Sequence, residues 1–281
     1  MGFHTQLHPR KFGDAIFSGK EVDIIQKYIS KISKIFDIYN KISKLDVSVS
    51  QLYPITVFEN GMFLVYDLDN LQRNYFLAAE QVSEIHVPEG VRACFPLDFY
   101  GGKISAVVSP DAFNDIYGYI AIFHEFVHCY QFENYEMELK DGLEIAHRAQ
   151  EKKDFMWELT HSFPYNDKKF IDETEKLARY FEIGFIDGIK EYYLKMKRYL
   201  KKCDYEYMIW QQWKEGFARY IENKIRSVLK VPKNTNKIVQ PFKRVTFYEI
   251  GSKYIDVIFD TKPEVKGNLK KLFRIMFECS I

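Results

Sequence analysis

A chain of 281 residues that is 47% hydrophobic and 28% charged is long enough to bury a substantial core and has the composition of a globular protein. Its 40 basic and 39 acidic side chains leave a formal charge of +1, so no positive field attracts nucleic acid and we expect no nucleic-acid partner. No apolar run approaches the ~18 residues that a membrane span needs, and we expect no membrane association.

The first predicted helix covers residues 21–44, where Ile, Tyr and Phe recur at three- and four-residue spacing opposite a lysine-rich face. A β-rich region follows it. Asn60-Gly61 separates the apolar runs ITVF and MFLVY and predicts a tight hairpin. Gly101-Gly102 separates VRACFPLDFY from KISAVVS and predicts a second hairpin, in which Pro96 favours a sheet edge or a bulge.

From about residue 111 the pattern becomes helical. We expect Asp111 to start a helix that runs through residues 112–134. Later helices are expected over 137–160, 167–202, 205–230, 246–260 and the tail LKKLFRIMFEC. The sequence therefore predicts an α+β fold. A small mixed or antiparallel sheet lobe, residues 1–111, is followed by a mostly helical lobe, residues 112–281, with the transition within or just after the 112–134 helix.

His124, Glu125 and His128 form an HExxH motif in the middle of that helix. Side chains four residues apart share a helix face, so the two imidazoles can point at one ion. Glu125 lies one residue along, where it could deprotonate a water held by the ion. Zinc suits this arrangement, because imidazole nitrogen is a good zinc ligand and an open position takes a water whose pKa falls to about 7.

The alternative is an amphipathic helix with two incidental histidines. The motif arises by chance in roughly one percent of chains of this composition, so it indicates a metal site without establishing one. Its apolar neighbours indicate a helix that is buried on most faces; they are Ile120, Ile122, Phe123, Phe126 and Val127. Burying two imidazoles and a carboxylate is costly unless they are satisfied, and one metal ion would satisfy all three.

A catalytic zinc needs a third protein ligand, and Glu215 in QQWKEGFARYIENK is the favoured candidate. Glu215 projects off the apolar stripe of its predicted helix. Gly216 and Ala218 are small enough to let this helix approach the histidine helix closely. The stripe consists of Trp210, Trp213, Phe217, Tyr220 and Ile221.

Other residues could supply the third ligand. His147 is the main rival, because it follows the second histidine by a spacing familiar in metallopeptidases, and Glu144, His161 and Glu175 are further candidates. Cys129 points about 100° away from His128 on a helix, so we expect a buried structural thiol. The four cysteines form no CxxC pair, and the N-terminus lacks a secretory h-region, so we expect reduced thiols in a cytoplasmic protein.

With His124-Glu125-Phe126-Val127-His128 and Glu215-Gly216-Phe217-Ala218-Arg219-Tyr220, the chain resembles the HExxH gluzincin metallopeptidases, the peptidase MA-like group whose third zinc ligand is a helical glutamate. The resemblance covers about residues 103–260. It implies a zincin-like, thermolysin-like core with the metal between the two lobes. It also implies one zinc ion on His124, His128 and Glu215, with Glu125 as the general base.

The resemblance implies two further features of the site. KISAVVS, residues 103–109, would be an edge strand to which an extended peptide substrate adds by backbone pairing. Tyr248, with Tyr254 behind it, would donate to the oxyanion. Thermolysin-like enzymes carry an acidic residue four positions after the glutamate, where this chain has Arg219, so Glu222 or Asp141 would supply that carboxylate.

The sequence thus predicts a zinc-dependent metallopeptidase that hydrolyses peptide or protein substrates, with both lobes forming one catalytic unit. Two alternatives are left open. One is a non-catalytic helical binding protein with a structural or vestigial zinc site, and the other is a zinc hydrolase of non-peptide amides or esters. Substrate identity and oligomeric state are not predicted.

Overall fold

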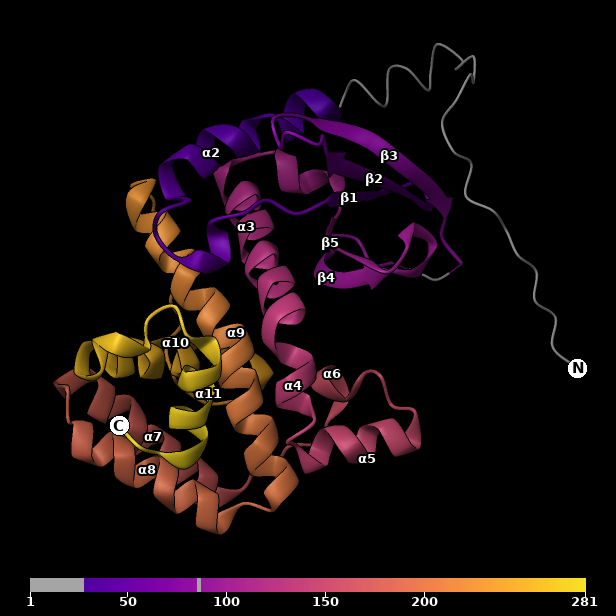
Figure 1. Cartoon of the computed structure of the whole chain (residues 1–281). Helices are drawn as coiled ribbons and strands as arrows, with labels where there is room; N and C mark the ends of the chain where they lie inside the picture. The colour runs from indigo at the N-terminus through magenta and orange to yellow at the C-terminus, as the bar shows by residue number, and fades with distance from the viewer. Residues whose placement is uncertain (1–27, 85–86) are drawn as a thin grey trace, which may run out of the picture. The chain divides into compact units, whose positions relative to one another are not determined.

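The computed structural model describes residues 28–84 and 87–281 (Figure 1), so the part of the first predicted helix before residue 28 lies outside the described residues. The chain divides into two compact units. The N-terminal unit ends at Tyr130, and the C-terminal unit comprises Gln131–Ile281. This division falls inside the predicted 112–134 helix and not at the predicted boundary between residues 111 and 112.

A five-stranded sheet forms the centre of the N-terminal unit, with the strand order β3-β2-β1-β5-β4 (Figure 1). β1 and β5 are parallel, and the other neighbouring pairs are antiparallel, so the sheet is mixed. The α+β class and the mixed sheet were predicted correctly. The strands are β1 (Ile55–Glu59), β2 (Met62–Leu68), β3 (Tyr75–Val82), β4 (Arg92–Leu97) and β5 (Lys103–Val108).

Both predicted hairpins are present. Asn60 and Gly61 link β1 to β2 and both have positive φ, of 52° and 76°. Gly101 and Gly102 occupy the same left-handed region between β4 and β5, which a glycine enters without the steric cost that a side chain brings. β3 was not predicted, because YFLAAEQV shows no regular alternation of apolar and polar residues.

The prediction that residues 103–109 form an edge strand was wrong. β5 lies between β1 and β4, and Ala106 is opposite Ile55 on one side and Cys94 on the other. The turn at Gly101-Gly102 folds β4 onto one side of β5, while β1 pairs in parallel with the other side. The outer strand on this side is therefore β4. Pro96 has no backbone N–H to donate, and an outer strand tolerates this because one of its sides has no neighbouring strand.

Helix α3 (Ile116–Gln131) lies within the predicted 112–134 helix and begins later than expected. Asp115 starts it by accepting a hydrogen bond from the Gly118 amide at 2.9 Å, whereas Asp111 pairs with Arg92 at 2.7 Å. Residues 110–113 form a short 3-10 turn, η3, before the helix. Among the described residues of this unit, the other helical elements are α2 (Lys34–Ile42), η1 (Val47–Val49) and η2 (Asp98–Tyr100), and residues 28–32 are also helical.

Apolar side chains cover both faces of the sheet. One face carries a buried cluster formed by Phe63, Val65, Ala79, Leu97 and Val107. On the other face, the Tyr66 ring packs against Tyr28 and the Tyr75 ring against Phe36, with centroids 6.2 and 5.6 Å apart. Because strand side chains alternate between faces, β2 is buried along most of its length.

Helices make up the C-terminal unit (Figure 1). The helices predicted over 205–230, 246–260 and the tail are present as α9, α10 and α11. The predicted 137–160 and 167–202 helices are each interrupted, the second at Gly184, whose φ of 67° ends α7. The elements are η4 (Phe132–Glu136, a π-helical turn), α4 (Met137–Lys140), α5 (Glu144–Lys152), α6 (Trp157–Thr160), α7 (Lys168–Ile183), α8 (Ile186–Tyr199), α9 (Lys202–Val228), α10 (Arg244–Thr261), η5 (Pro263–Val265) and α11 (Leu269–Glu278).

Helix α9 runs through the core of this unit. The predicted apolar stripe is buried except for the partly exposed Tyr220, and Trp210, Trp213 and Phe217 are fully covered. The Trp213 indole donates to the Leu269 carbonyl at 3.0 Å and so ties α9 to the start of α11. Among the helices that the structure describes, none combines the length and the apolar character required to span a membrane.

Candidate metal centre

Helix α3 places His124 and His128 one turn apart on one face. Their Nε2 atoms are 3.2 Å apart, and the rings are inclined by 75°. His128 and the intervening Glu125 are each only 6% exposed, and His124 is partly buried. Two nitrogens that each lie 2.0–2.1 Å from a tetrahedral ion are separated by about 3.3 Å, so the spacing of the imidazoles fits a shared zinc ion.

Glu215 projects from α9 with 16% of its side chain exposed. An Arg244 guanidinium nitrogen lies 3.7 Å from its carboxylate. Tyr248, also on α10, hydrogen bonds to the same carboxylate. Burial and the Glu215 charge raise the pKa of the Tyr248 phenol well above its usual value, although Arg244 acts in the opposite direction. Tyr248 is therefore neutral at physiological pH and available as a proton donor.

Gly216 and Gly251 bring α9 and α10 into backbone contact. A Cβ on Gly216 would lie 2.6 Å from Gly251 Cα, and a Cβ on Gly251 would lie 2.2 Å from the Gln212 carbonyl oxygen. This crossing explains why Glu215, next to Gly216, meets Tyr248, which precedes Gly251 by one turn. The prediction that Gly216 lets α9 approach the histidine helix was wrong. A Cβ on Gly216 would point at α10 instead.

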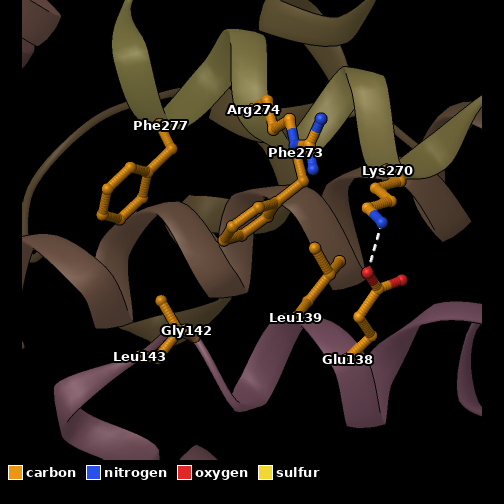
Figure 2. Close-up of a pocket in the computed structure, with 8 residues that line it drawn as sticks. All are labelled: Glu138, Leu139, Gly142, Leu143, Lys270, Phe273, Arg274 and Phe277. Atoms are coloured by element: carbon orange, nitrogen blue, oxygen red, sulfur yellow. Dashed lines mark hydrogen bonds and ion pairs between the residues drawn. The ribbon is translucent and has the colours of Figure 1, made fainter.

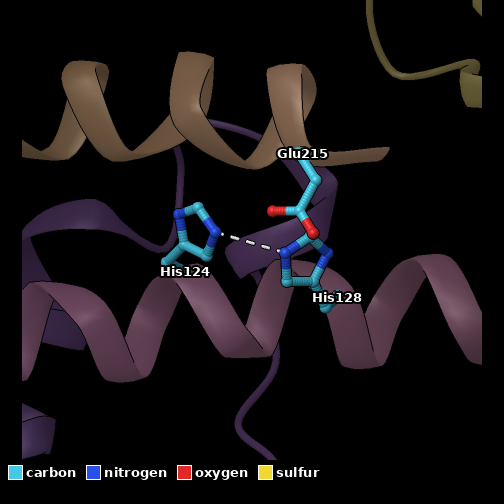
Figure 3. A group of neighbouring side chains, drawn as sticks. All are labelled: His124, His128 and Glu215. Atoms are coloured by element: carbon cyan, nitrogen blue, oxygen red, sulfur yellow. Dashed lines mark hydrogen bonds between the residues drawn. The ribbon is translucent and has the colours of Figure 1, made fainter. Parts of the chain in front are cut away.

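The ligand atoms of His124, His128 and Glu215 lie within 4.8 Å of one another (Figure 3). These are the three residues that the sequence predicted as zinc ligands. Two imidazoles and one carboxylate are a donor set found in catalytic zinc sites, where a fourth position stays open. The residues present therefore fit a zinc ion, both in their chemistry and in the spacing of the two imidazoles.

The rival ligands are engaged elsewhere in the described chain. His161 Nε2 is 2.8 Å from Asp204. Glu144 pairs with Arg148 and Lys202, and Glu175 accepts a hydrogen bond from Gln240. His147 lies on α5 and is not part of the group in Figure 3.

The carboxylates expected to support the site lie in other surroundings. Glu222 is buried, and its oxygens contact Arg219 at 3.3 Å and Arg226 at 2.8 Å. The Asn234 amide donates a further hydrogen bond to Glu222 at 2.9 Å. Asp141 is exposed at the end of α4. The carboxylate of Glu222 thus pairs with two arginines of its own helix.

Three residues near Glu215 were not predicted from the sequence: Arg244, Tyr207 and Tyr165. Tyr207 interacts electrostatically with Glu215, and Tyr165 interacts electrostatically with Tyr207, Arg244 and Tyr248. Burial raises the pKa of both phenols. The sequence does not distinguish Tyr207 and Tyr165 from the rest of the 20 tyrosines, because the segments that carry them meet only in the folded chain. Tyr254, the second candidate for the oxyanion donor, is fully buried and stacks on Tyr193 with ring centroids 3.9 Å apart.

A charged network surrounds Lys214, the neighbour of Glu215 on α9. Lys214 Nζ lies 2.9 Å from Glu136 and 3.0 Å from Glu158. Lys140 contacts the same two carboxylates at 3.0 and 2.8 Å. Burial opposes the charge of Lys214, but the two glutamates prevail and raise its pKa well above the usual value. Two lysines and two glutamates thus form a closed, charge-balanced square.

The C-terminal unit also has a pocket of about 210 Å³ between α4 and α11 (Figure 2). It contains none of the predicted site residues. Lys270 pairs with Glu138 across its rim. The lining is mostly apolar and consists of Glu138, Leu139, Gly142, Leu143, Lys270, Phe273, Arg274 and Phe277.

Comparisons of the chain with protein-family models, with curated proteins and with solved structures found no match. The residues of the site and the resemblance carried by the two short motifs are therefore the only basis for assigning a function.

Proposed function

We propose that this chain is a zinc-dependent metallopeptidase with a zincin-like catalytic core. The observation that carries the proposal is the convergence of His124, His128 and Glu215, whose ligand atoms lie within 4.8 Å of one another. The HExxH motif supports it, because Glu125 follows the first histidine on α3 in the position of a general base. The choice of a peptide substrate depends on the resemblance to the gluzincins alone.

Zinc, when bound, would polarise the substrate carbonyl and lower the pKa of a water molecule. Glu125 would accept the proton of the attacking water and pass it to the leaving amine. Its burial within α3 holds the carboxylate in place and excludes bulk solvent. Tyr248 would turn from Glu215 and donate its phenolic hydrogen to the developing oxyanion. Arg244, 3.7 Å from Glu215, would help to orient that carboxylate as a ligand.

We place the enzyme in the cytoplasm as part of this proposal. None of the four cysteines, all of which lie within the described residues, forms a disulfide in the structure, which suits a reducing compartment.

Metal content tests the ligand set. Purified wild type should hold one zinc per chain by elemental analysis, and His128→Ala and Glu215→Ala should each lose it. His161→Ala and Glu175→Ala are matched controls for a histidine and a glutamate outside the group, and both should retain zinc. Stoichiometric zinc in Glu215→Ala would refute that ligand. A wild type that binds no zinc, even after loading, would refute the metal site altogether.

Activity tests the base. Glu125→Gln should retain zinc yet lose about 10²- to 10⁴-fold in hydrolysis of casein or a peptide library, because the amide cannot accept the proton. Retained activity would contradict the role of Glu125. A zinc-loaded wild type that cleaves esters or small amides but no peptide would replace the metallopeptidase with the non-peptide hydrolase. A zinc-loaded wild type that cleaves neither would indicate a structural site.

A further inference from the structure

Two thiols face each other in the N-terminal unit. Cys94 lies on the outer strand β4, and Cys129 lies on α3 directly after His128. Their Sγ atoms are 3.2 Å apart. Cys129 is fully buried, whereas Cys94 is partly exposed. The sequence separates these residues by 35 positions, so only the packing of α3 against the sheet brings the sulfurs together.

The geometry permits a covalent bond with little rearrangement. A disulfide has an S–S length of about 2.05 Å, so the sulfurs would need to approach by roughly 1.2 Å. β4 pairs with β5 alone and is an outer strand, so it can make such a shift without breaking a second ladder. The aromatic contact of Tyr53 with Phe126, with centroids 5.7 Å apart, holds α3 in this unit.

The other two thiols have different surroundings. Cys279 is buried against the Tyr205 hydroxyl, with sulfur and oxygen 3.2 Å apart. Cys203 is partly exposed on α9, and burial raises its pKa, which disfavours the reactive thiolate. Both belong to the C-terminal unit. The Sγ–Sγ contact recorded among the described cysteines is the one between Cys94 and Cys129.

We propose that Cys94 and Cys129 are a redox modification site, at which hydrogen peroxide forms an intramolecular disulfide. The partly exposed Cys94 attacks the peroxide, so that an S–O bond forms, the O–O bond breaks, and one water leaves. The Cys129 sulfur then attacks the sulfenic acid of Cys94, the S–O bond breaks, and a second water leaves. Overall, two thiols are oxidised to a disulfide while one peroxide is reduced to two waters.

The cross-link would join the histidine-bearing helix to the edge of the sheet. Cys129 points about 100° away from His128 around the helix, so the bond uses neither imidazole. A cellular thiol reductant would restore both cysteines by exchange. The inference is independent of the proposed function, because it requires neither a metal nor a substrate.

The test treats the full-length protein with hydrogen peroxide, then blocks the remaining thiols and maps the peptides without reduction. Wild type should lose two of its four thiols. The map should contain one linked species that joins the peptides of Cys94 and Cys129 and is lighter by two hydrogens than their sum. Dithiothreitol should release both peptides. A link that includes Cys203 or Cys279, or four intact thiols under peroxide that oxidises free cysteine, would overturn the proposal.

Matched variants assign the roles of the two sulfurs. Cys203→Ser should form the same link at an unchanged rate. Cys129→Ala should form none and should instead accumulate a sulfenic acid on Cys94, trapped by a carbon nucleophile such as dimedone. Cys94→Ser is a second test at a partly exposed position, where a substitution disturbs packing less than at the buried Cys129. It too should form no link. A wild-type rate of link formation in Cys94→Ser would overturn the assignment.

Discussion

Lys214 and Glu215 are adjacent on α9 but belong to two different kinds of polar cluster. Lys214 lies in a square of two lysines and two glutamates whose four contacts span 2.8–3.0 Å. Glu215 lies in a group of one carboxylate and two imidazoles. The first cluster balances its own charge. The second consists of electron-pair donors, which favour a bound cation.

The comparison shows how the balance of a cluster indicates its role. Buried ions that are fully paired fix the packing of helices, and removing one partner leaves a charge uncompensated. The His124 group instead gathers two imidazoles and one carboxylate, a donor set that could hold a metal ion, and its single carboxylate lies 3.7 Å from Arg244. The two clusters should therefore respond to different perturbations: the Lys214 square to mutation and to acid, and the His124 group to metal.

The largest effect is expected from Lys214→Met. It removes one of the two cations that hold Glu136 and Glu158, and should lower the free energy of unfolding by about 3–5 kcal/mol. Lys224→Met is the control on the same helix, because Lys224 is half exposed and 3.8 Å from Asp256, and should cost about 1 kcal/mol or less. Denaturant unfolding measures both. Equal effects would show that the square does not stabilise the fold.

A smaller effect is expected from Glu158→Gln, and it should depend on pH. Burial opposes ionisation of Glu158, but Lys214 and Lys140 outweigh it and lower the pKa to about 2 from an ordinary value of 4.5. Each pKa unit corresponds to about 1.4 kcal/mol, so the ionised group contributes roughly 3 kcal/mol at neutral pH.

Because the folded pKa is depressed, this stabilisation is fully present above pH 4.5 and is lost as the pH falls toward 2. Unfolding of wild type and Glu158→Gln should differ by roughly 3 kcal/mol at pH 7 and converge near pH 2. A difference that is constant over this range would show that the lysines do not perturb Glu158.

The smallest effect is expected from zinc. At a free concentration one hundred times its Kd, zinc should stabilise wild type by about 2.7 kcal/mol, measured as a rise in Tm. Glu215→Gln should show much less of this rise, while its metal-free stability should change by about 1 kcal/mol or less, because Glu215 is partly exposed. Glu175→Gln should respond to zinc as wild type does. The full zinc response in Glu215→Gln would remove the contrast between the clusters.

Local sequence patterns predicted the elements whose signals are short in range. Asn60-Gly61 and Gly101-Gly102 predicted both hairpins, since a left-handed turn requires such residues at fixed positions. The apolar stripe of α9 predicted a long helix with Trp210 and Trp213 in its core. The start of α3 was misplaced by several residues, because Asp111 and Asp115 carry the same local capping signal and only the fold assigns Asp111 to Arg92.

Long-range features were less predictable. The resemblance implied that β5 is an edge strand, and the sequence carries no local signal of its parallel pairing with β1 that would have corrected this. Gly216 was correctly recognised as a site of close approach, but its partner Gly251 lies on α10, 35 positions further along. No spacing in the sequence indicates that Arg244 and Tyr207 lie near Glu215 in the folded chain.

By itself, the sequence determined that His124 and His128 share a face, because a helix repeats every 3.6 residues and a spacing of four brings side chains together. It also singled out Glu215, through an apolar stripe and small neighbours. Only the tertiary structure decided that Glu215, and not His147, His161 or Glu175, lies with the two histidines, and that Lys214 belongs to a closed ionic square. The reason is that these contacts depend on how helices cross, and a crossing is set by packing rather than by any periodicity of the chain.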